Sequence, residues 1–398
     1  MTSAAQPSPR VAIACGGTGG HLFPGLAVGD QLTRRGCEVI LLISPKDVDQ
    51  QAVKAVTGME IHTLPAVGLT RGGKIAFTRG FARSYRAART LFRSKPPLAA
   101  LAMGGFTSAP PILAARSLGA KAFLHESNSV PGRANRWLAW IAHRAFIGFP
   151  SAGGRLRNRN VSLTGTPVRP QFQPCDAATC RSALGLMPER PVLLVMGGSQ
   201  GASAINDLVT KSLPSFVDRF PDLQWLHLTG SADAEKVMRA YATLRLKALV
   251  RPFFGPMELA LGAATAAVSR AGASSLAELA AMGVPAVLVP YPKAVDNHQF
   301  HNARAFEACG AARLLEQQSA TPEILVQLLS DYLGKPTVRE KAQQALAQWH
   351  VPEAAQRIAE AILDSVGVQA RKPQTLTSAP ATALDLPGNH VAEKRMAA

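Results

Sequence analysis

A carboxylate and two hydroxyls stand close together in the second half of the chain, in a pattern that suits a nucleotide. Ser274, Ser275 and Glu278 follow Gly272 at the point where an apolar strand gives way to a helix. The start of a helix offers unpaired backbone N–H groups and a positive dipole end, and a glycine lets a phosphate approach closely. Glu278 lies one turn later, where its carboxylate would accept hydrogen bonds from a ribose. A plainer interpretation stays open, because Ser275 and Glu278 also have the spacing of a capping box.

The residues on either side predict the elements that position this group. Apolar residues indicate a strand at 266–269, small residues a turn at 270–273, and helical periodicity a helix over 274–282 that ends at Gly283. A second apolar strand at 284–290 leads into a polar loop. The segment is therefore a strand–helix–strand unit, whose helix N-terminus faces the edge where open α/β sheets bind ligands.

Three glycine-rich turns elsewhere follow apolar strands in the same way. They are GGTGGH at 16–21, MGGFTS at 103–108 and MGGSQG at 196–201. Such a turn is the usual place for a phosphate or for close packing, and after the first one we expect a helix over 26–35. The spacing of this turn does not fit GxGxxG, and Glu38 stands at the start of the next strand rather than at its far end. A nicotinamide cofactor is therefore disfavoured. The acidic pair Asp47 and Asp49 lies in a polar stretch before a helix, and we do not interpret it as a metal site.

A second polar cluster ends the strand expected at 121–125. His125, Glu126, Ser127 and Asn128 crowd together at that strand's carboxyl end, again the edge where ligands bind. Such a cluster can simply cap the following helix. Its density favours a functional role.

Residues 69–95 form a strongly basic segment without a single acid. Phe77, Phe81, Tyr85 and Phe92 recur at helical spacing, with arginines on the other faces. One interpretation is a domain helix with a buried aromatic stripe. The other is a patch that dips into the headgroup region of an anionic membrane; its candidate residues are Leu69, Lys74, Phe77, Arg79 and Phe81.

The composition narrows the classes of partner. A formal net charge of +17 points to phosphates, whether in nucleic acid, anionic lipid or a pyrophosphate-bearing substrate. The five cysteines show no metal-binding spacing, so we expect reduced thiols in a cytosolic protein. No apolar run is long enough to span a membrane.

Strands and helices alternate in both halves of the chain, which predicts an α/β fold of two doubly wound parallel sheets. A stretch rich in proline and turn formers, 165–174, separates the halves and places Arg169 over a cleft between them. We therefore expect a leader at 1–9, an N-terminal domain over 10–168, a C-terminal domain over 169–351 and a final helix at 352–366. Residues 369–398 are expected to form a disordered tail.

Seven motifs in series resemble one family. In chain order they are GGTGGHLFPGLAV, MGGFTSAP, HESN, GTPVR, MGGSQGA, SRAGASSLAELAAMGVPAVLVP and HQFHNA, and they resemble the MurG family of peptidoglycan N-acetylglucosaminyltransferases. The resemblance implies a GT-B fold of two Rossmann-like domains. It implies inverting transfer of N-acetylglucosamine from UDP-N-acetylglucosamine to the C4 hydroxyl of the muramoyl sugar of lipid I, which gives lipid II. It further implies peripheral attachment to the cytoplasmic face of the membrane, no cofactor, and a final helix that returns to the N-terminal domain.

The resemblance also implies roles for single residues. Ser199 and Arg169 should contact the diphosphate, and the backbone of Phe254 should recognise the uracil. The nucleotide should lie on Ala273, Ser274, Ser275, Leu276, Ala277 and Glu278, with Glu278 on the ribose. The sugar should be surrounded by Thr18, Gly19, Gly20, Asn128, Gln299 and Asn302.

Inversion requires one displacement, in which the acceptor hydroxyl attacks the anomeric carbon while UDP leaves. His21, at the lip of the first glycine turn, is the first candidate for the base that deprotonates this hydroxyl, and Glu126 is the second. Arg169 and the helix N-terminus would meet the departing charge, so no metal is required. Ser127, Thr166 and the loop 292–296 depart from the family pattern, which leaves the detail of the sugar contacts open.

Three other functions remain as alternatives. A lipid glycosyltransferase acting on diacylglycerol would share the nucleotide half but not HESN beside GGTGGH. UDP-N-acetylglucosamine 2-epimerase shares the fold, but it has no use for a basic aromatic membrane segment. A nucleic-acid-binding protein would fit the charge, but the sequence holds no recognised binding motif. We therefore expect no nucleic acid among the partners.

Overall fold

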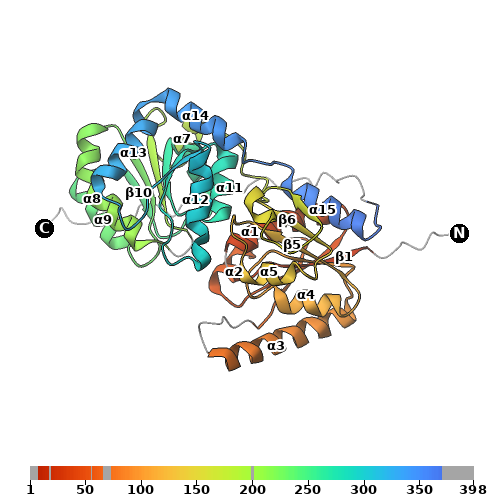
Figure 1. The fold of residues 1–398 in the computed structure, drawn as a ribbon. Coiled ribbons are helices and arrows are strands. Elements are labelled where there is room, and N and C mark those ends of the chain that lie inside the picture. Colours follow the sequence, from red (N-terminus) through yellow and green to blue (C-terminus); the bar gives the residue numbers. More distant parts are fainter. Residues whose placement is uncertain (1–7, 18, 55, 66–72, 199–200, 370–398) are drawn as a thin grey trace.

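The computed structural model describes residues 8–369 except 18, 55, 66–72 and 199–200. It contains two parallel sheets, each covered by helices and lying side by side in Figure 1. This is the two-domain α/β architecture that the sequence predicts, and the expected GT-B fold is confirmed.

The N-terminal domain is built on a seven-stranded sheet in the order β3-β2-β1-β4-β5-β6-β7. Its elements are β1 (Arg10–Ala14), α1 (Gly19–Arg34), β2 (Glu38–Ile43), α2 (Asp47–Ala52), β3 (Glu60–Thr63), α3 (Gly73–Ser94), β4 (Ala99–Ala102), α4 (Ala109–Arg116), β5 (Lys121–Glu126), α5 (Arg133–Leu138), β6 (Arg144–Ile147), α6 (Pro150–Gly153) and β7 (Val161–Leu163). The central strands are apolar at nearly every position because helices cover both faces of the sheet.

The C-terminal domain repeats the plan with six strands in the order β10-β9-β8-β11-β12-β13. Its elements are α7 (Ala177–Ala183), β8 (Val192–Met196), α8 (Ser203–Arg219), β9 (Gln224–Leu228), α9 (Ala234–Thr243), β10 (Ala248–Arg251), α10 (Met257–Ala263), β11 (Ala266–Ser269), α11 (Ala273–Met282), β12 (Ala286–Leu288), the 3₁₀ turn η1 (Val295–Asn297), α12 (His298–Ala308), β13 (Ala312–Leu314), α13 (Pro322–Gly334) and α14 (Pro336–Ala347). In both sheets the first strand of the domain pairs with the strands on either side of it, so the strand order reverses there. Ligands of such sheets bind at this reversal point, beyond the carboxyl ends of the strands.

The last helix, α15 (Ala354–Ser365), leaves the C-terminal domain and packs on the N-terminal one (Figure 1). Ile358 and Ile362 are fully buried in the N-terminal core. The buried guanidinium of Arg35 binds Glu360 at 2.8 Å, and this ion pair fixes the helix against α1. The chain therefore crosses twice between the domains.

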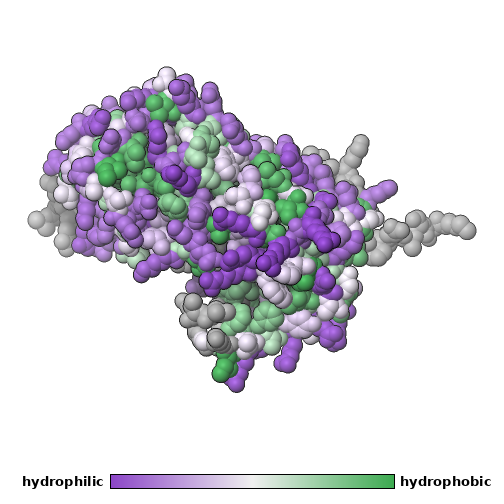
Figure 2. Space-filling model, viewed as in Figure 1, coloured by the Kyte–Doolittle hydropathy of each residue, from purple (hydrophilic) through white to green (hydrophobic). Residues whose placement is uncertain are grey.

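Helix α3 is long and basic, and its aromatic side chains are divided between the interior and the surface. Phe77 and Phe81 are half-buried with ring centroids 6.2 Å apart, whereas Ile75 in the first turn is 68% exposed. Figure 2 shows hydrophobic surface at the lower end of α3 beside strongly hydrophilic side chains. Among the described residues no helix is long and apolar enough to cross a membrane.

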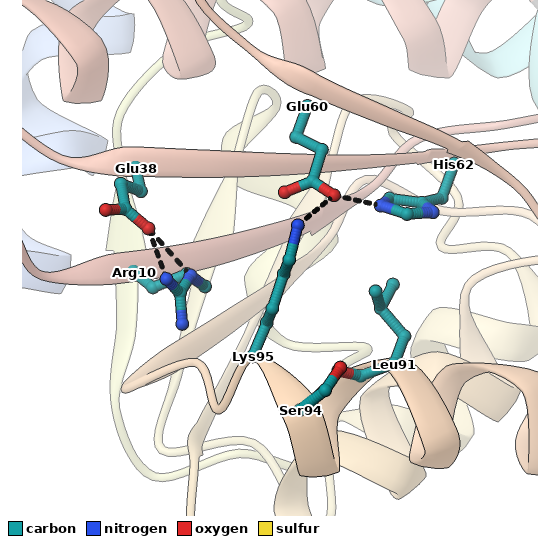
Figure 3. A network of polar contacts seen from close by, with 7 residues as sticks. All are labelled: Arg10, Glu38, Glu60, His62, Leu91, Ser94 and Lys95. Atoms are coloured by element: carbon teal, nitrogen blue, oxygen red, sulfur yellow. Dashed lines mark hydrogen bonds and ion pairs between the residues drawn. The ribbon is translucent and has the colours of Figure 1, made fainter.

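Ion pairs lie where β1 and β2 begin and along the outermost strand β3 (Figure 3). Glu38 accepts a hydrogen bond from Nε of Arg10 at 2.9 Å, and Glu60 binds both His62 and Lys95 at 2.6 Å. Glu38 therefore lies at the far edge from the carboxyl ends of the strands and cannot serve as a ribose acceptor there.

One element begins earlier than the sequence predicted. Helix α1 starts at Gly19 rather than at 26, so Gly20 and His21 belong to its first turn instead of to the preceding loop. Glycine disfavours the interior of a helix, but the N–H groups of a first turn have no partner in the helix, so the disadvantage there is small.

Candidate active site

The N-termini of α1 and α11 meet at the junction of the two domains. Oγ of Ser274 donates a hydrogen bond to the carbonyl of Gly20 at 2.9 Å. This carbonyl is free because Pro24, four residues later in α1, has no N–H to donate to it. A proline inside the helix thus leaves an acceptor for the other domain, and two helix N-termini with their positive dipole ends face one site.

His21 lies in the first turn of α1, with its ring against the second glycine turn. A Cβ at Gly104 would fall 2.7 Å from Cε1 of His21, and Gly104 has a φ of +113°, so only glycine fits there. Burial lowers the pKa of His21, and the nearby charge of Glu126 opposes this shift. Nδ1 of His21 has no hydrogen-bond partner among the described residues. The imidazole is therefore neutral at pH 7, with a ring nitrogen that can accept a proton.

Glu126 is buried, and both of its carboxylate oxygens are already hydrogen-bonded. Oε1 accepts from the backbone N–H and the side-chain amide of Asn128 at 2.9 and 3.1 Å. Oε2 accepts from the N–H of Gly132 and the amide of Asn135, both at 2.9 Å. The carboxylate thus organises the loop between β5 and α5, and this arrangement favours His21 over Glu126 as the base.

Asn128 and Asn302 lie next to each other, as expected, but they bind one another. Nδ2 of Asn302 donates to Oδ1 of Asn128 at 3.0 Å and to the carbonyl of Ala271 at 3.1 Å. Its Oδ1 accepts from the N–H of Ser129 at 2.9 Å, and Asn302 is fully buried. These two amides therefore join the two domains directly.

Arg169 and Glu278 approach each other behind the start of α11. Nη2 of Arg169 lies 3.8 Å from Oε1 of Glu278. Burial raises the pKa of Glu278 to about 7, and Arg169 acts in the opposite direction. The guanidinium stacks over the rings of Phe23 and Phe172 at 4.3 and 4.8 Å. Sequence reasoning missed both rings: Phe23 is 146 residues from Arg169 and leaves no local pattern, and Phe172, only three residues away, stands in the linker without helical or strand periodicity.

The first glycine turn is fixed by an acid that the sequence offered as part of a DxD pattern. Oδ2 of Asp49 accepts hydrogen bonds from the N–H of Gly17 at 2.6 Å and of Ser44 at 3.2 Å. Lys46 in turn donates to the carbonyl of Gly17 at 2.6 Å. Asp49 is buried and holds the turn, and among the described residues no cluster of His, Cys, Asp or Glu has the arrangement of a metal site.

The remaining candidates are less constrained. Gln299 accepts a hydrogen bond from the N–H of Tyr291 at 2.9 Å, which leaves its amide nitrogen available. Phe254 is half-buried against the C-terminal core. Ser275, Leu276 and Ala277 lie in the first turns of α11 with Ala273 and Ser274. Thr18, Leu69 and Ser199, and the side chain of Lys74, lie outside the described residues.

Comparison with known proteins bears on the family of the chain. Residues 11–147 match the glycosyltransferase family 28 N-terminal domain, and residues 192–358 match the C-terminal domain of the same family. A relative from Acidithiobacillus ferrooxidans is 39% identical over 360 residues, covering 90% of this chain and 98% of the relative. It is named UDP-N-acetylglucosamine--N-acetylmuramyl-(pentapeptide) pyrophosphoryl-undecaprenol N-acetylglucosamine transferase.

Two further comparisons agree with the first. A relative of the same name from Sorangium cellulosum is 39% identical over 364 residues, covering 89% of this chain and 88% of the relative. The crystal structure of MurG from Acinetobacter baumannii superposes with a TM-score of 0.69 at 30% identity, covering 90% of this chain and all of that one.

Proposed function

The chain belongs to glycosyltransferase family 28 and, within it, to the MurG family, and from this premise we propose how its domain junction carries out the reaction. The enzyme transfers N-acetylglucosamine from UDP-N-acetylglucosamine to the N-acetylmuramoyl-pentapeptide pyrophosphoryl-undecaprenol called lipid I, and the product is lipid II. One observation carries the residue assignments: the hydrogen bond from Ser274 to Gly20 brings the glycine turn with His21 to the N-terminus of α11.

The donor nucleotide occupies the C-terminal side of this junction. Glu278 accepts hydrogen bonds from the ribose hydroxyls. The N-terminus of α11 and Arg169 face the diphosphate. We further assign Ser199 to the diphosphate and the backbone of Phe254 to the uracil. The stacking of Arg169 between Phe23 and Phe172 supports this role, because it holds the guanidinium in place before the donor arrives.

His21 acts on the acceptor. Its ring nitrogen takes the proton of the C4 hydroxyl as the oxygen forms its bond to the anomeric carbon. On the opposite face of the sugar the bond to the UDP oxygen breaks, so the configuration inverts and UDP leaves with the electron pair. Arg169 and two helix N-termini offer the positive charge that stabilises this leaving group. Gly19, Gly20, Gln299 and the Asn128–Asn302 pair border the sugar, with Thr18 beside them.

The acceptor is anchored in lipid, and α3 is suited to meet that surface. A groove of about 560 Å³ runs along the helix, and its lining includes Phe81, Tyr85, Arg86, Arg89 and Arg93. The exposed Ile75 lies at the end of the same helix, near Arg79. We assign this face to the anionic headgroups of the cytoplasmic leaflet, which accounts for the basic charge without nucleic acid.

Calorimetric titration with UDP-N-acetylglucosamine tests the donor site. Arg169→Ala should weaken binding by on the order of 10-fold or more, the scale of a lost charge-assisted hydrogen bond. Arg190→Ala is the matched control, since Arg190 is a half-exposed arginine of the same domain that pairs with Asp222. Equal affinities for the three proteins would remove Arg169 from the donor site.

A further inference from the structure

A short segment of the C-terminal domain reaches over to the N-terminal domain beside the site. This strap, residues 291–297, connects β12 to α12 and contains η1. Asp296 and Asn297 both adopt the left-handed conformation, with φ of +51° and +50°. Aspartate and asparagine tolerate this region better than other non-glycine residues. Two such residues in a row turn the chain sharply just before α12 begins.

The turn presents the carboxylate of Asp296 to the other domain. Oδ2 of Asp296 lies 2.5 Å from Nη2 of Arg136, and Oδ1 lies 3.5 Å from Nη2 of Arg133. Both arginines belong to α5, directly after the HESN loop. One acid of the C-terminal domain therefore bridges two bases of the N-terminal domain, and its side chain is 29% exposed.

The strap is also tied to residues that border the donor sugar. The N–H of Tyr291, at its start, donates to Gln299, and Nδ1 of His298 bonds to the carbonyl of Val295 at 2.8 Å. Burial lowers the pKa of His21, and the charge of His298, in the first turn of α12, acts in the same direction. The position of the strap thus sets where the first turn of α12 stands relative to the base.

We propose that Asp296 is a positioning residue for sugar transfer, whose ion pairs with Arg133 and Arg136 hold α12 and the domain junction in the reactive arrangement. This inference rests on the proposed function of the site. Donor affinity resides mainly on α11 and Arg169, outside the strap. Loss of the ion pairs should therefore lower kcat while UDP-N-acetylglucosamine binding stays nearly unchanged.

A charge-swap cycle tests the proposal. The variants are Asp296→Lys, Arg136→Glu and the two combined, with Asp296→Glu as the conservative replacement. Asp222→Lys is the matched control, because Asp222 is an exposed acid of the same domain that pairs with Arg190 within that domain. For each variant we would measure kcat at low and high salt, the donor dissociation constant and the melting temperature.

Asp296→Lys should lower kcat about 10-fold at low salt, less at high salt because ions screen partly exposed charges. The combined variant should recover to within about 3-fold of the wild type, and Asp296→Glu should stay near it. Wild-type kcat for Asp296→Lys, or a combined variant no better than the product of the single losses, would overturn the proposal. A wild-type enzyme without acceptor-dependent transfer would instead refute the proposed function itself.

Discussion

His21 has the environment that we expect of the proposed catalytic base. Its ring lies against Gly104, where a Cβ would clash with it, its pKa is lowered by burial, and Nδ1 has no partner among the described residues. His125, on β5 of the same domain, is equally buried. Its Nδ1 is hydrogen-bonded to Ser127 and its Nε2 to the carbonyl of Gly165. The first environment leaves a proton acceptor, whereas the second does not.

Replacing His21 by alanine should lower kcat by on the order of 100-fold or more, the usual scale for loss of a general base. Steady-state kinetics with a soluble acceptor would measure it, with His62→Ala as the control because His62 lies on β3, the outermost strand of the sheet, where it binds Glu60. If His21 is the base, it works in its neutral form, and burial lowers its pKa; kcat at saturating donor should therefore hold in mildly acidic solution and fall only as His21 becomes protonated. Nearly normal kcat with a raised KM would leave His21 with a binding role only.

Glu278 should make donor binding depend on pH. Its pKa is raised to about 7, so the carboxylate that accepts the ribose hydroxyls forms only as the pH rises through 7. UDP-N-acetylglucosamine should therefore bind more tightly at pH 8 than at pH 6, and calorimetry should show this dependence vanish in Glu278→Gln. Stability should change in the opposite direction. The folded state holds this proton more tightly than the unfolded chain, so the free energy of unfolding decreases as the pH rises from about 4.5 to 7. If donor binding by Glu278→Gln depended on pH as strongly as that of the wild type, another group would be responsible for the dependence.

The motifs and the family resemblance name candidate residues for the site, but they do not show which partners these residues take in the fold. The pattern HESN indicates a functional cluster. It does not show that the carboxylate oxygens of Glu126 accept hydrogen bonds from Asn128, Gly132 and Asn135. The pairing of Asn128 with Asn302 joins residues 174 positions apart. Such contacts depend on how the two domains dock, which no local pattern records.

At the scale of elements, the strands were the most predictable part, because a buried parallel strand is apolar on both faces. The starts of the helices were harder to predict. The glycines of GGTGGH suggested a loop, whereas α1 begins within them. Pro24, which normally opposes a helix interior, here frees the Gly20 carbonyl for Ser274. The rule that proline ends a helix therefore fails here, because the hydrogen bond missing from α1 is replaced by one between the domains.

Helix α3 carries the half-buried Phe77 and Phe81 and, in its first turn, the exposed Ile75, which the sequence had not singled out. Ile75 is the exposed member, so Ile75→Glu should weaken binding to vesicles with anionic lipid by about 5-fold or more without destabilising the fold. Turnover of a short-chain, soluble acceptor should be unchanged. Sedimentation with vesicles measures this.

Met238→Glu supplies the control for that experiment, since Met238 is an exposed hydrophobic residue of the other domain. Phe81→Ser is a poorer test, because Phe81 is half-buried and its loss would also lower stability. Equal vesicle binding by Ile75→Glu and the wild type would exclude the start of α3 from the membrane contact.

At the scale of the whole molecule, two similar domains are joined by a linker, by α15 and by direct contacts between their facing edges. The repeated order of strands and helices predicted two sheets, and the motif series predicted the family. The arrangement of the domains needed the structure, because it rests on single contacts such as Arg136 with Asp296. These contacts lie where donor and acceptor must meet.

Transfer of radiolabelled sugar from UDP-N-acetylglucosamine to a short-chain lipid I analogue, with EDTA present throughout, tests the central claim most directly. We predict labelled disaccharide lipid only when the acceptor is present, with an undiminished rate in EDTA, since Arg169 and two helix N-termini supply the positive charge. Release of UDP without a glycosylated lipid would contradict the assignment and point to hydrolysis or epimerisation at this site.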